Sequence, residues 1–316
     1  MNPRIVFPSS TDTVAEVAEP GSYGIAPPGH RLPMGTHVGS VRLQVAELGR
    51  SLAWYERVMG FRVLAQSATV ATLGAEGATL PLVELNQHAG ALPAQRRGRL
   101  GLFHYAILLP DRPALGRLLA HLAGTGTATG AADHLVSESL YLHDPDGLGI
   151  EVYADRPRQD WRRHGRELAM TTLPLDAEGV VQAGGGQPWT AMPAGTTLGH
   201  IHLHVGDLDL AAGFYHVALG LDVMVWNYPG ALFLAAGGYH HHLGLNTWAG
   251  PDAEPPKPGE ARLLEWEVVV PGAEQVEATA GGMAAAGHTV KRDSEGWVAP
   301  DPWGTLLRLR NGGQAA

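Results

Sequence analysis

The chain of 316 residues contains no cysteine. This absence excludes disulfide bridges, a cysteine nucleophile and a zinc site built from thiolates, so any metal must be held by histidine, aspartate or glutamate. Positive charge is also scarce, with 22 Lys and Arg against 31 Asp and Glu and a formal net charge of -9. Nucleic acids and anionic membranes bind basic patches, and no block of Lys and Arg is present. We therefore expect a small-molecule substrate.

Long hydrophobic runs are missing as well. No segment approaches the roughly 20 apolar residues of a membrane span. The first residues, MNPRIVFPSS, lack the basic start and apolar core of a secretion signal, so we expect a cytoplasmic protein. Residues 1–34 are rich in Pro, Gly, Ser and Thr, which predicts an extended tail with no core of its own.

An internal repeat organises the rest of the chain. Residues 38–64 align with 198–224, and 82–90 align with 242–250 at the same offset. Two further segments, starting near 100 and 262, each run from an apolar strand through a helical pattern to a DPDG or DPWG turn and a last strand. The change from two-residue to helical periodicity predicts α+β modules of the βαβββ type.

We expect four such modules, whose polar strand faces line concave cups. The predicted boundaries are modules 1 and 2 in residues 35–156, a linker rich in Gly and Pro at 157–197, and modules 3 and 4 in residues 198–312.

Candidate metal ligands lie on the polar faces of these strands. In IHLHV, strand alternation places His200, His202 and His204 on the face opposite the aliphatic residues. In module 2, Glu151 alternates with aliphatic neighbours, and a buried carboxylate must be paired or bound to a metal. A lone inward histidine such as His104 is more often a hydrogen-bonded core residue. Together, His104 and Glu151 indicate half of a metal site.

A run of histidines in module 3 adds to His200. Interpreted as a strand, it places His240 and His242 on the inward face, while His241 points with Leu243. A solvated histidine cluster is the simpler alternative. The alternation with leucine favours the inward cluster.

Four segments carry a resemblance to a known family: GHIHLHV, GGYHHHLGLNTW, LFHYAILLPDR and DHLVSESLYLHDPDGLGIEVYADRP. They resemble the vicinal oxygen chelate superfamily, with its glyoxalase/dioxygenase fold of two cup-like half-barrels. Within it, the chain is similar to the extradiol ring-cleaving dioxygenases of the catechol 2,3-dioxygenase type over about residues 36–312. The residues that satisfy the extradiol signature are His134, Leu140, Tyr141, Asp144, Pro145, Gly147 and Glu151. Ala132 departs from it.

The resemblance implies a site and a reaction. His104, His200 and Glu151 would hold Fe(II), for which Mn(II) is an alternative with the same ligand preferences. Around the metal, His134 and Tyr141 would hydrogen-bond substrate or oxygen, and His242 would act as the acid/base group. The implied partners are a small aromatic diol and O₂, the implied product is ring-opened, and a homo-oligomer is compatible with these features.

Modules 1 and 4 lack these residues. Ser40 stands where module 3 has His200, Leu82 where it has His242, and Glu265 and Arg308 where module 2 has His104 and Glu151. Neither modules 1 and 2 nor modules 3 and 4 contain all three of the implied metal ligands. We therefore predict that modules 2 and 3 share one cup, within a chain or between two chains, and that Glu265 and Arg308 form an ion pair in the other.

Two other functions are open at this stage. A glyoxalase-like isomerase would use Glu84, His104 and Glu151, which leaves His134, Tyr141 and the module 3 histidines without a role. A metal-free protein that binds an aromatic compound or antibiotic would bind its ligand in the presence of a chelator.

Overall fold

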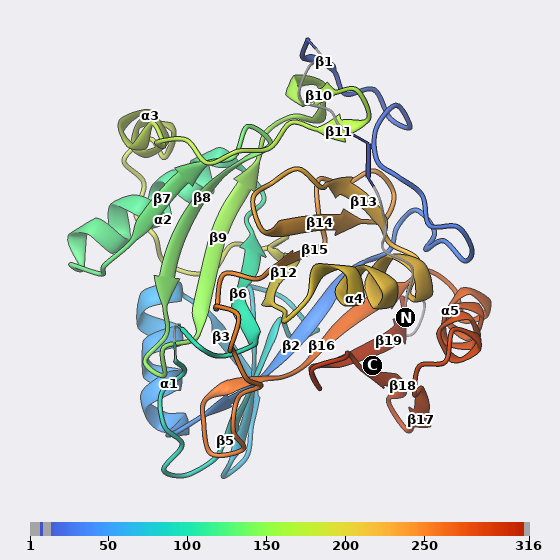
Figure 1. Ribbon diagram of the computed structural model, residues 1–316. Helices are drawn as coiled ribbons and strands as arrows, with labels where there is room; N and C mark the ends of the chain where they lie inside the picture. The colour runs from blue at the N-terminus through green and yellow to red at the C-terminus, as the bar shows by residue number, and fades with distance from the viewer. Residues whose placement is uncertain (1–6, 9–13, 96, 313–316) are drawn as a thin grey trace.

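The computed structural model describes residues 7–8, 14–95 and 97–312 (Figure 1). Module 1 contains β2 (His37–Val45), α1 (Leu48–Trp54), the π-helical turn η1 (Tyr55–Met59), β3 (Arg62–Gln66), β4 (Val70–Gly74) and β5 (Val83–Gln87). Module 2 contains β6 (Gly101–Leu108), α2 (Arg112–Gly124), β7 (Gly130–Asp133), β8 (Ser137–His143) and β9 (Gly149–Asp155).

The second half repeats this order. Module 3 contains β12 (Thr197–His204), α4 (Leu208–Ala212), the π-helical turn η3 (Gly213–Ala218), β13 (Asp222–Val225), β14 (Ala231–Ala235) and β15 (Leu243–Asn246). Module 4 contains β16 (Arg262–Val270), α5 (Ala273–Ala285), β17 (Lys291–Asp293), β18 (Gly296–Pro300) and β19 (Leu306–Asn311). The predicted α+β fold built from four βαβββ modules is confirmed.

Local sequence explains where the helices begin and end. Asp111 and Asp207 precede α2 and α4, and each carboxylate accepts a hydrogen bond from a backbone N–H of the first turn. Such caps satisfy donors that the helix itself leaves free. In module 1, Gly60 ends the helical segment at a φ of 77°, a conformation that glycine adopts without strain.

Two eight-stranded sheets pair the modules in the predicted, non-sequential way. One sheet has the order β13-β14-β15-β12-β6-β9-β8-β7 and joins modules 3 and 2. The other has the order β17-β18-β19-β16-β2-β5-β4-β3 and joins modules 4 and 1. The prediction that modules 2 and 3 face each other is confirmed, within one chain. The crossing is made by β12, which runs antiparallel to β6.

The linker and the tail pack on this frame. Linker strands β10 (Arg162–His164) and β11 (Glu167–Leu168) form a small sheet with β1 (Glu16–Val17) of the tail. The linker also holds the short η2 (Arg158–Asp160) and α3 (Ala177–Ala183), which lies on α2. The tail buries Ala18 and Tyr23 in a second core cluster with Trp161, and its residues 1–6 and 9–13 lie outside the described part. The division at 35–156 and 198–312 stays a prediction.

None of the helices in the described part of the chain is both long and apolar enough to span a membrane.

Candidate metal centre and substrate cavity

Three neighbouring strands bring the predicted ligands together. Glu151 of β9 places its Oε2 atom 2.9 Å from Nε2 of His104 on β6 and 3.0 Å from Nε2 of His200 on β12. One ligand atom from each of the three lies within 4.8 Å of the others. The sheet register explains this convergence, because Ala106 of β6 pairs with both His200 and Glu151, and all three ligands are buried.

The electrostatics of the cluster favour the forms that bind metal. Burial alone would raise the pKa of the Glu151 carboxyl, but His200 and His104 hold it well below its usual range. Burial lowers the pKa of His200 to about 4, against the pull of Glu151. A neutral imidazole and an ionised carboxylate are the forms that coordinate a divalent cation.

One buried atom indicates that a metal fits. Although His104 Nε2 lies 2.9 Å from a carboxylate oxygen, it makes no hydrogen bond to the described residues. A buried polar atom without a partner is costly. A cation bound between the two rings and Glu151 would satisfy it, and two imidazoles with one carboxylate form a donor set typical of non-haem Fe(II) sites. The cluster can therefore hold a metal ion.

His134 and Tyr141, which were predicted to hydrogen-bond substrate or oxygen, lie beside this cluster. His134 Nε2 is 2.6 Å from the Tyr141 hydroxyl, and His134 Nδ1 is 2.7 Å from the carbonyl oxygen of Thr171. Because a carbonyl only accepts, Nδ1 carries the proton of neutral His134 and Nε2 accepts from Tyr141. Burial, and then Glu151, keep the pKa of Tyr141 well above its usual range. The Tyr141 oxygen is thus protonated and retains lone pairs for a ligand.

The histidine run does not form the predicted strand. Strand β15 begins only at Leu243, so the three histidines before it lie in an irregular segment and do not alternate as predicted. His241 lines the cavity at the metal cluster, with its ring centroid 4.0 Å from that of His200. His242 lines a different hollow, and its Nδ1 accepts a hydrogen bond from the backbone N–H of Ala236. His241, and not His242, is thus among the described residues that line the cavity at the metal cluster.

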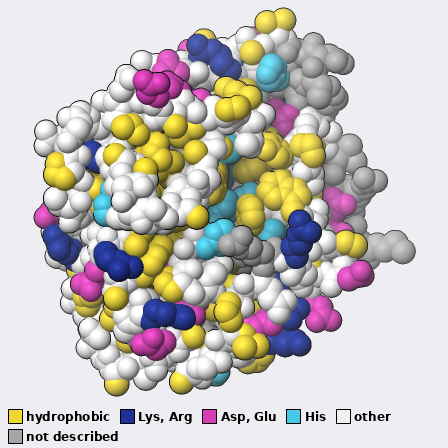
Figure 2. All heavy atoms as spheres, turned by 90° about the vertical axis from the view of Figure 1, so that its left-hand side faces the viewer, with side chains coloured by type: hydrophobic (Ala, Val, Ile, Leu, Met, Phe, Trp, Pro, Cys, Tyr) yellow, Lys and Arg dark blue, Asp and Glu magenta, His cyan; other side chains and the backbone are white. Residues whose placement is uncertain are grey.

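The cavity has a volume of about 340 Å³ and aromatic walls. Four of its lining residues are Phe103, Tyr228, Phe233 and Trp248, and of the described residues that line it, Glu151 is the sole Asp, Glu, Lys or Arg. Figure 2 shows histidine side chains near the middle of one face of the molecule with hydrophobic side chains around them. The cavity therefore suits a flat, uncharged ligand that reaches the metal cluster at one end.

The linker closes part of this cavity. Met170, Thr171 and Thr172 contribute to its wall. The Thr172 hydroxyl lies 2.9 Å from that of Tyr228, which joins the linker to module 3 at the cavity wall. This contribution could not be predicted from periodicity, since the segment has no regular pattern.

A second polar network fixes His202, which also lines the cavity. Asn246 Oδ1 accepts from the backbone N–H of Trp248 and lies 2.6 Å from Nδ1 of His204. The backbone donor identifies this atom as the amide oxygen, so the amide nitrogen donates to Nε2 of His202, 2.9 Å away. His202 is thereby held neutral, and burial and His104 also lower its pKa well below the usual value. His202 shares a ring neighbour with each of the other two histidines of β12. The ring of His104 lies 5.6 Å from that of His200 and 5.0 Å from that of His202, and the ring of Phe103 contacts both His202 and His204, which agrees with the predicted shared face.

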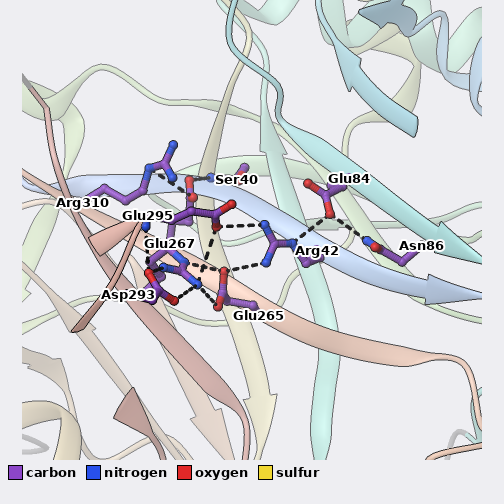
Figure 3. Close-up of polar contacts among 10 residues, drawn as sticks. Ser40, Arg42, Glu84, Asn86, Glu265, Glu267, Asp293, Glu295 and Arg310 are labelled. Atoms are coloured by element: carbon purple, nitrogen blue, oxygen red, sulfur yellow. Dashed lines mark hydrogen bonds and ion pairs between the residues drawn. The ribbon is translucent and has the colours of Figure 1, made fainter. Parts of the chain in front are cut away.

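The other cup contains ion pairs in place of a metal (Figure 3). Arg308 donates to both oxygens of Glu265 at 2.7 and 2.9 Å, and both side chains are buried. The predicted ion pair is confirmed. Arg42, which was not anticipated, lies 3.4 Å from Glu265 and 2.8 Å from Glu84. Because Glu84 belongs to this sheet and pairs with Arg42, the glyoxalase-like ligand set of Glu84, His104 and Glu151 is not assembled.

Comparisons with known proteins agree with this geometry. The family model of the Glyoxalase/Bleomycin resistance protein/Dioxygenase superfamily matches residues 37–152. The catechol-2,3-dioxygenase of Bacillus subtilis (strain 168) is 46% identical over 271 residues, which cover 84% of this chain and 94% of the relative. The chain belongs to this superfamily. Its similarity to that relative places it among the dioxygenase oxidoreductases of the superfamily.

Solved structures show the same fold. A candidate dioxygenase from Bacillus subtilis subsp. subtilis str. 168 has a TM-score of 0.61 at 14% identity, with 90% of this chain and 87% of that chain covered. Glyoxalase I from Zea mays has a TM-score of 0.51 at 18% identity, with 88% and 92% covered. At these identities the similarity concerns the fold alone.

Proposed function

We propose that the chain binds Fe(II), with Mn(II) as the alternative, through His104, His200 and Glu151, and that it cleaves catechol-type rings with O₂ next to the diol. The observation that carries the proposal is the convergence of these three side chains, from modules 2 and 3, beside an aromatic cavity that His104 and Glu151 line. When bound, the metal would take both the diol and O₂ as ligands and so activate them toward each other.

The surrounding residues would orient the diol and move its protons. The Tyr141 hydroxyl donates a hydrogen bond to His134. The Tyr141 oxygen can therefore accept a hydrogen bond from a substrate hydroxyl. His241 is buried at the cavity wall, and burial, followed by His200, lowers its pKa well below the usual value. A neutral imidazole there can take a proton from the second hydroxyl and return it later in the reaction. We therefore assign to His241 the acid/base role that the sequence indicated for His242.

The cavity walls favour one class of catechol. Flat aromatic side chains contact a ring through stacking and edge-on geometries. Because no lysine or arginine is found among the described lining residues, a carboxylate on the ring would be buried without a partner, which is unfavourable. Uncharged catechols, bare or with apolar substituents, are the proposed substrates.

An oxygen-electrode experiment tests the proposal. The protein is loaded anaerobically with Fe(II) and mixed with catechol or 4-methylcatechol, and Glu151→Ala, loaded in the same way, is the control. We expect one O₂ consumed per catechol by the unmodified protein and none by the variant. Catechol binding that survives a chelator without any oxygen uptake would instead support the metal-free binding protein.

A further inference from the structure

A chain of hydrogen bonds runs from the protein surface to His241. Asp155, at the end of β9, places Oδ1 2.9 Å from Nε2 of His240. The other ring nitrogen of His240, Nδ1, lies 2.7 Å from Nδ1 of His241. Asp155 keeps 28% of its side-chain surface exposed, whereas His240 is fully buried and His241 lies at the cavity. The three residues thus connect solvent to the wall of the substrate cavity.

With an ionised Asp155 and a neutral His240, the donors and acceptors along this chain have one consistent order. Asp155 Oδ1 also accepts a hydrogen bond from the hydroxyl of Tyr239. An ionised carboxylate only accepts, so Nε2 of His240 carries a proton and donates it. In neutral His240 the Nδ1 atom is then an acceptor, and it must receive its hydrogen bond from Nδ1–H of His241. Neutral His241 has one ring proton, so its Nε2 atom is left with a free lone pair.

The free Nε2 atom is the one available to substrate. Its neighbour Nδ1 is used by His240, and among the described residues Nε2 of His241 has no hydrogen-bond partner. If the order of the chain were reversed, His241 would hold its proton on Nε2 and could not accept one from a substrate hydroxyl. The direction of two hydrogen bonds therefore decides whether His241 can act as a base.

We infer that Asp155 and His240 are positioning residues, which hold His241 in the tautomer that presents an unprotonated Nε2 to the diol. The inference rests on the proposed function, because the role of His241 as a base belongs to that proposal. Asp155 and His240 contact no substrate themselves. Their effect passes through the orientation and the proton position of His241, as a carboxylate behind a histidine base does in other enzymes.

Two substitutions at Asp155 separate this role from a general structural one. In Asp155→Asn, the amide NH₂ can donate to Nε2 of His240 and so reverse the chain, while the side chain keeps its size. In Asp155→Leu, the acceptor is removed. Asp155→Glu keeps the carboxylate, and Asp160→Asn alters an exposed acid nearby and is the matched control.

The first readout is the tautomer itself, and it requires no turnover. In Zn(II)-loaded protein with ¹⁵N-labelled histidine, the ring nitrogens report which atom carries the proton, and loss of signals in His241→Gln identifies those of His241. We expect Nδ1–H for His241 in the unmodified protein, Asp155→Glu and Asp160→Asn. We expect Nε2–H in Asp155→Asn and a mixture in Asp155→Leu. A proton on Nε2 in the unmodified protein would overturn the inference.

The second readout is kinetic. We expect Asp155→Asn to lower kcat on the order of 10²-fold, the usual range for loss of a base, with anaerobic catechol affinity and metal content unchanged. Asp155→Glu should recover most of kcat. An active unmodified protein with unchanged kcat in both Asp155→Asn and Asp155→Leu would overturn the inference. An inactive unmodified protein would overturn the proposed function instead, and the tautomer measurement would still decide the order of the hydrogen bonds.

Discussion

His241 and His242 are adjacent in the chain but lie in different environments. His241 lies against the His200 ring at the cavity, whereas burial, followed by the nearby His240, lowers the pKa of His242 to about 3 in a separate hollow. Both are neutral at pH 7, so their charge does not distinguish them. Their position relative to the metal cluster does.

Paired substitutions test this distinction. We expect His241→Ala to retain the metal and to lower kcat roughly 10²-fold to 10⁴-fold, since a general acid/base is lost. His242→Ala should leave kcat within a few-fold. Steady-state oxygen uptake with catechol measures both, and a larger loss in His242→Ala than in His241→Ala would return the acid/base role to His242.

The three ligands should behave differently from both of these histidines. His104→Ala, His200→Ala and Glu151→Ala each remove one of three protein ligands, so we expect bound Fe(II) to fall below a tenth of a molar equivalent after gel filtration. Elemental analysis measures this content directly. Full metal content in two of the three variants would contradict the ligand set.

From the sequence, the types of residue in the site could be predicted better than the local backbone conformation that places them. Glu151 could be placed because strand alternation applies within β9, where Ile150 and Val152 face the core. His241 could not, because the segment before Leu243 is irregular and alternation has no meaning there. The Asp155–His240 contact could not be predicted from the sequence either, since it joins the end of one module to a loop of another.

At the level of elements, β16 and β19 hold a buried ion pair at the positions where β6 and β9 hold the proposed metal ligands His104 and Glu151. Glu265 and Arg308 are each about 5% exposed and bonded through both oxygens of the carboxylate. Attraction between two such groups roughly balances the loss of their hydration, but one left alone is strongly unfavourable.

Replacing one partner should therefore cost more than replacing both. We expect Arg308→Met to lower the free energy of unfolding by about 3 to 5 kcal/mol, because Glu265 is left buried without its main partner. The double variant Glu265→Leu/Arg308→Met should recover part of that loss. Urea denaturation measures each value, and a loss below about 1 kcal/mol in Arg308→Met would show that Arg42 compensates on its own.

The turn between β8 and β9 carries a buried acid, Asp144, whose pKa is shifted. Burial raises its pKa to about 7 from an ordinary value of 3.8, although the backbone N–H groups of Leu148 and Asp146 donate to it. Because the folded protein binds this proton more tightly than the unfolded chain, the contribution of Asp144 to stability is complete below pH 3.8 and is lost as the pH rises through about 7.

Asp144→Asn removes this titration and keeps an acceptor for the same backbone groups. We expect the free energy of unfolding of the unmodified protein to fall relative to that of Asp144→Asn between pH 4 and pH 7. Urea denaturation of both proteins at matched pH values gives the difference, which cancels the titration of other groups. A constant difference across this range would refute the raised pKa.

At the level of the whole molecule, the two pairs of modules differ in role: modules 2 and 3 contain the proposed metal ligands, and modules 1 and 4 contain ion pairs in their place. The sequence predicted the pairing of modules 2 and 3 because the ligand set is complete only in that combination, and the sheet order bears this out. It did not predict that linker strand β10 pairs with β1 of the tail on one side and with β11 on the other, or that residues after these strands line the cavity. Short strands with few aliphatic residues have too weak a pattern to be detected.

The proposed reaction inserts both atoms of O₂ into a catechol next to its two hydroxyls. The most direct test is a single turnover of the Fe(II)-loaded protein with catechol and isotopically labelled O₂, followed by mass spectrometry of the product. We expect one ring-opened hydroxymuconic semialdehyde per catechol with two labelled oxygens before exchange with water. A dicarboxylic acid from cleavage between the hydroxyls, or a product without label, would contradict it.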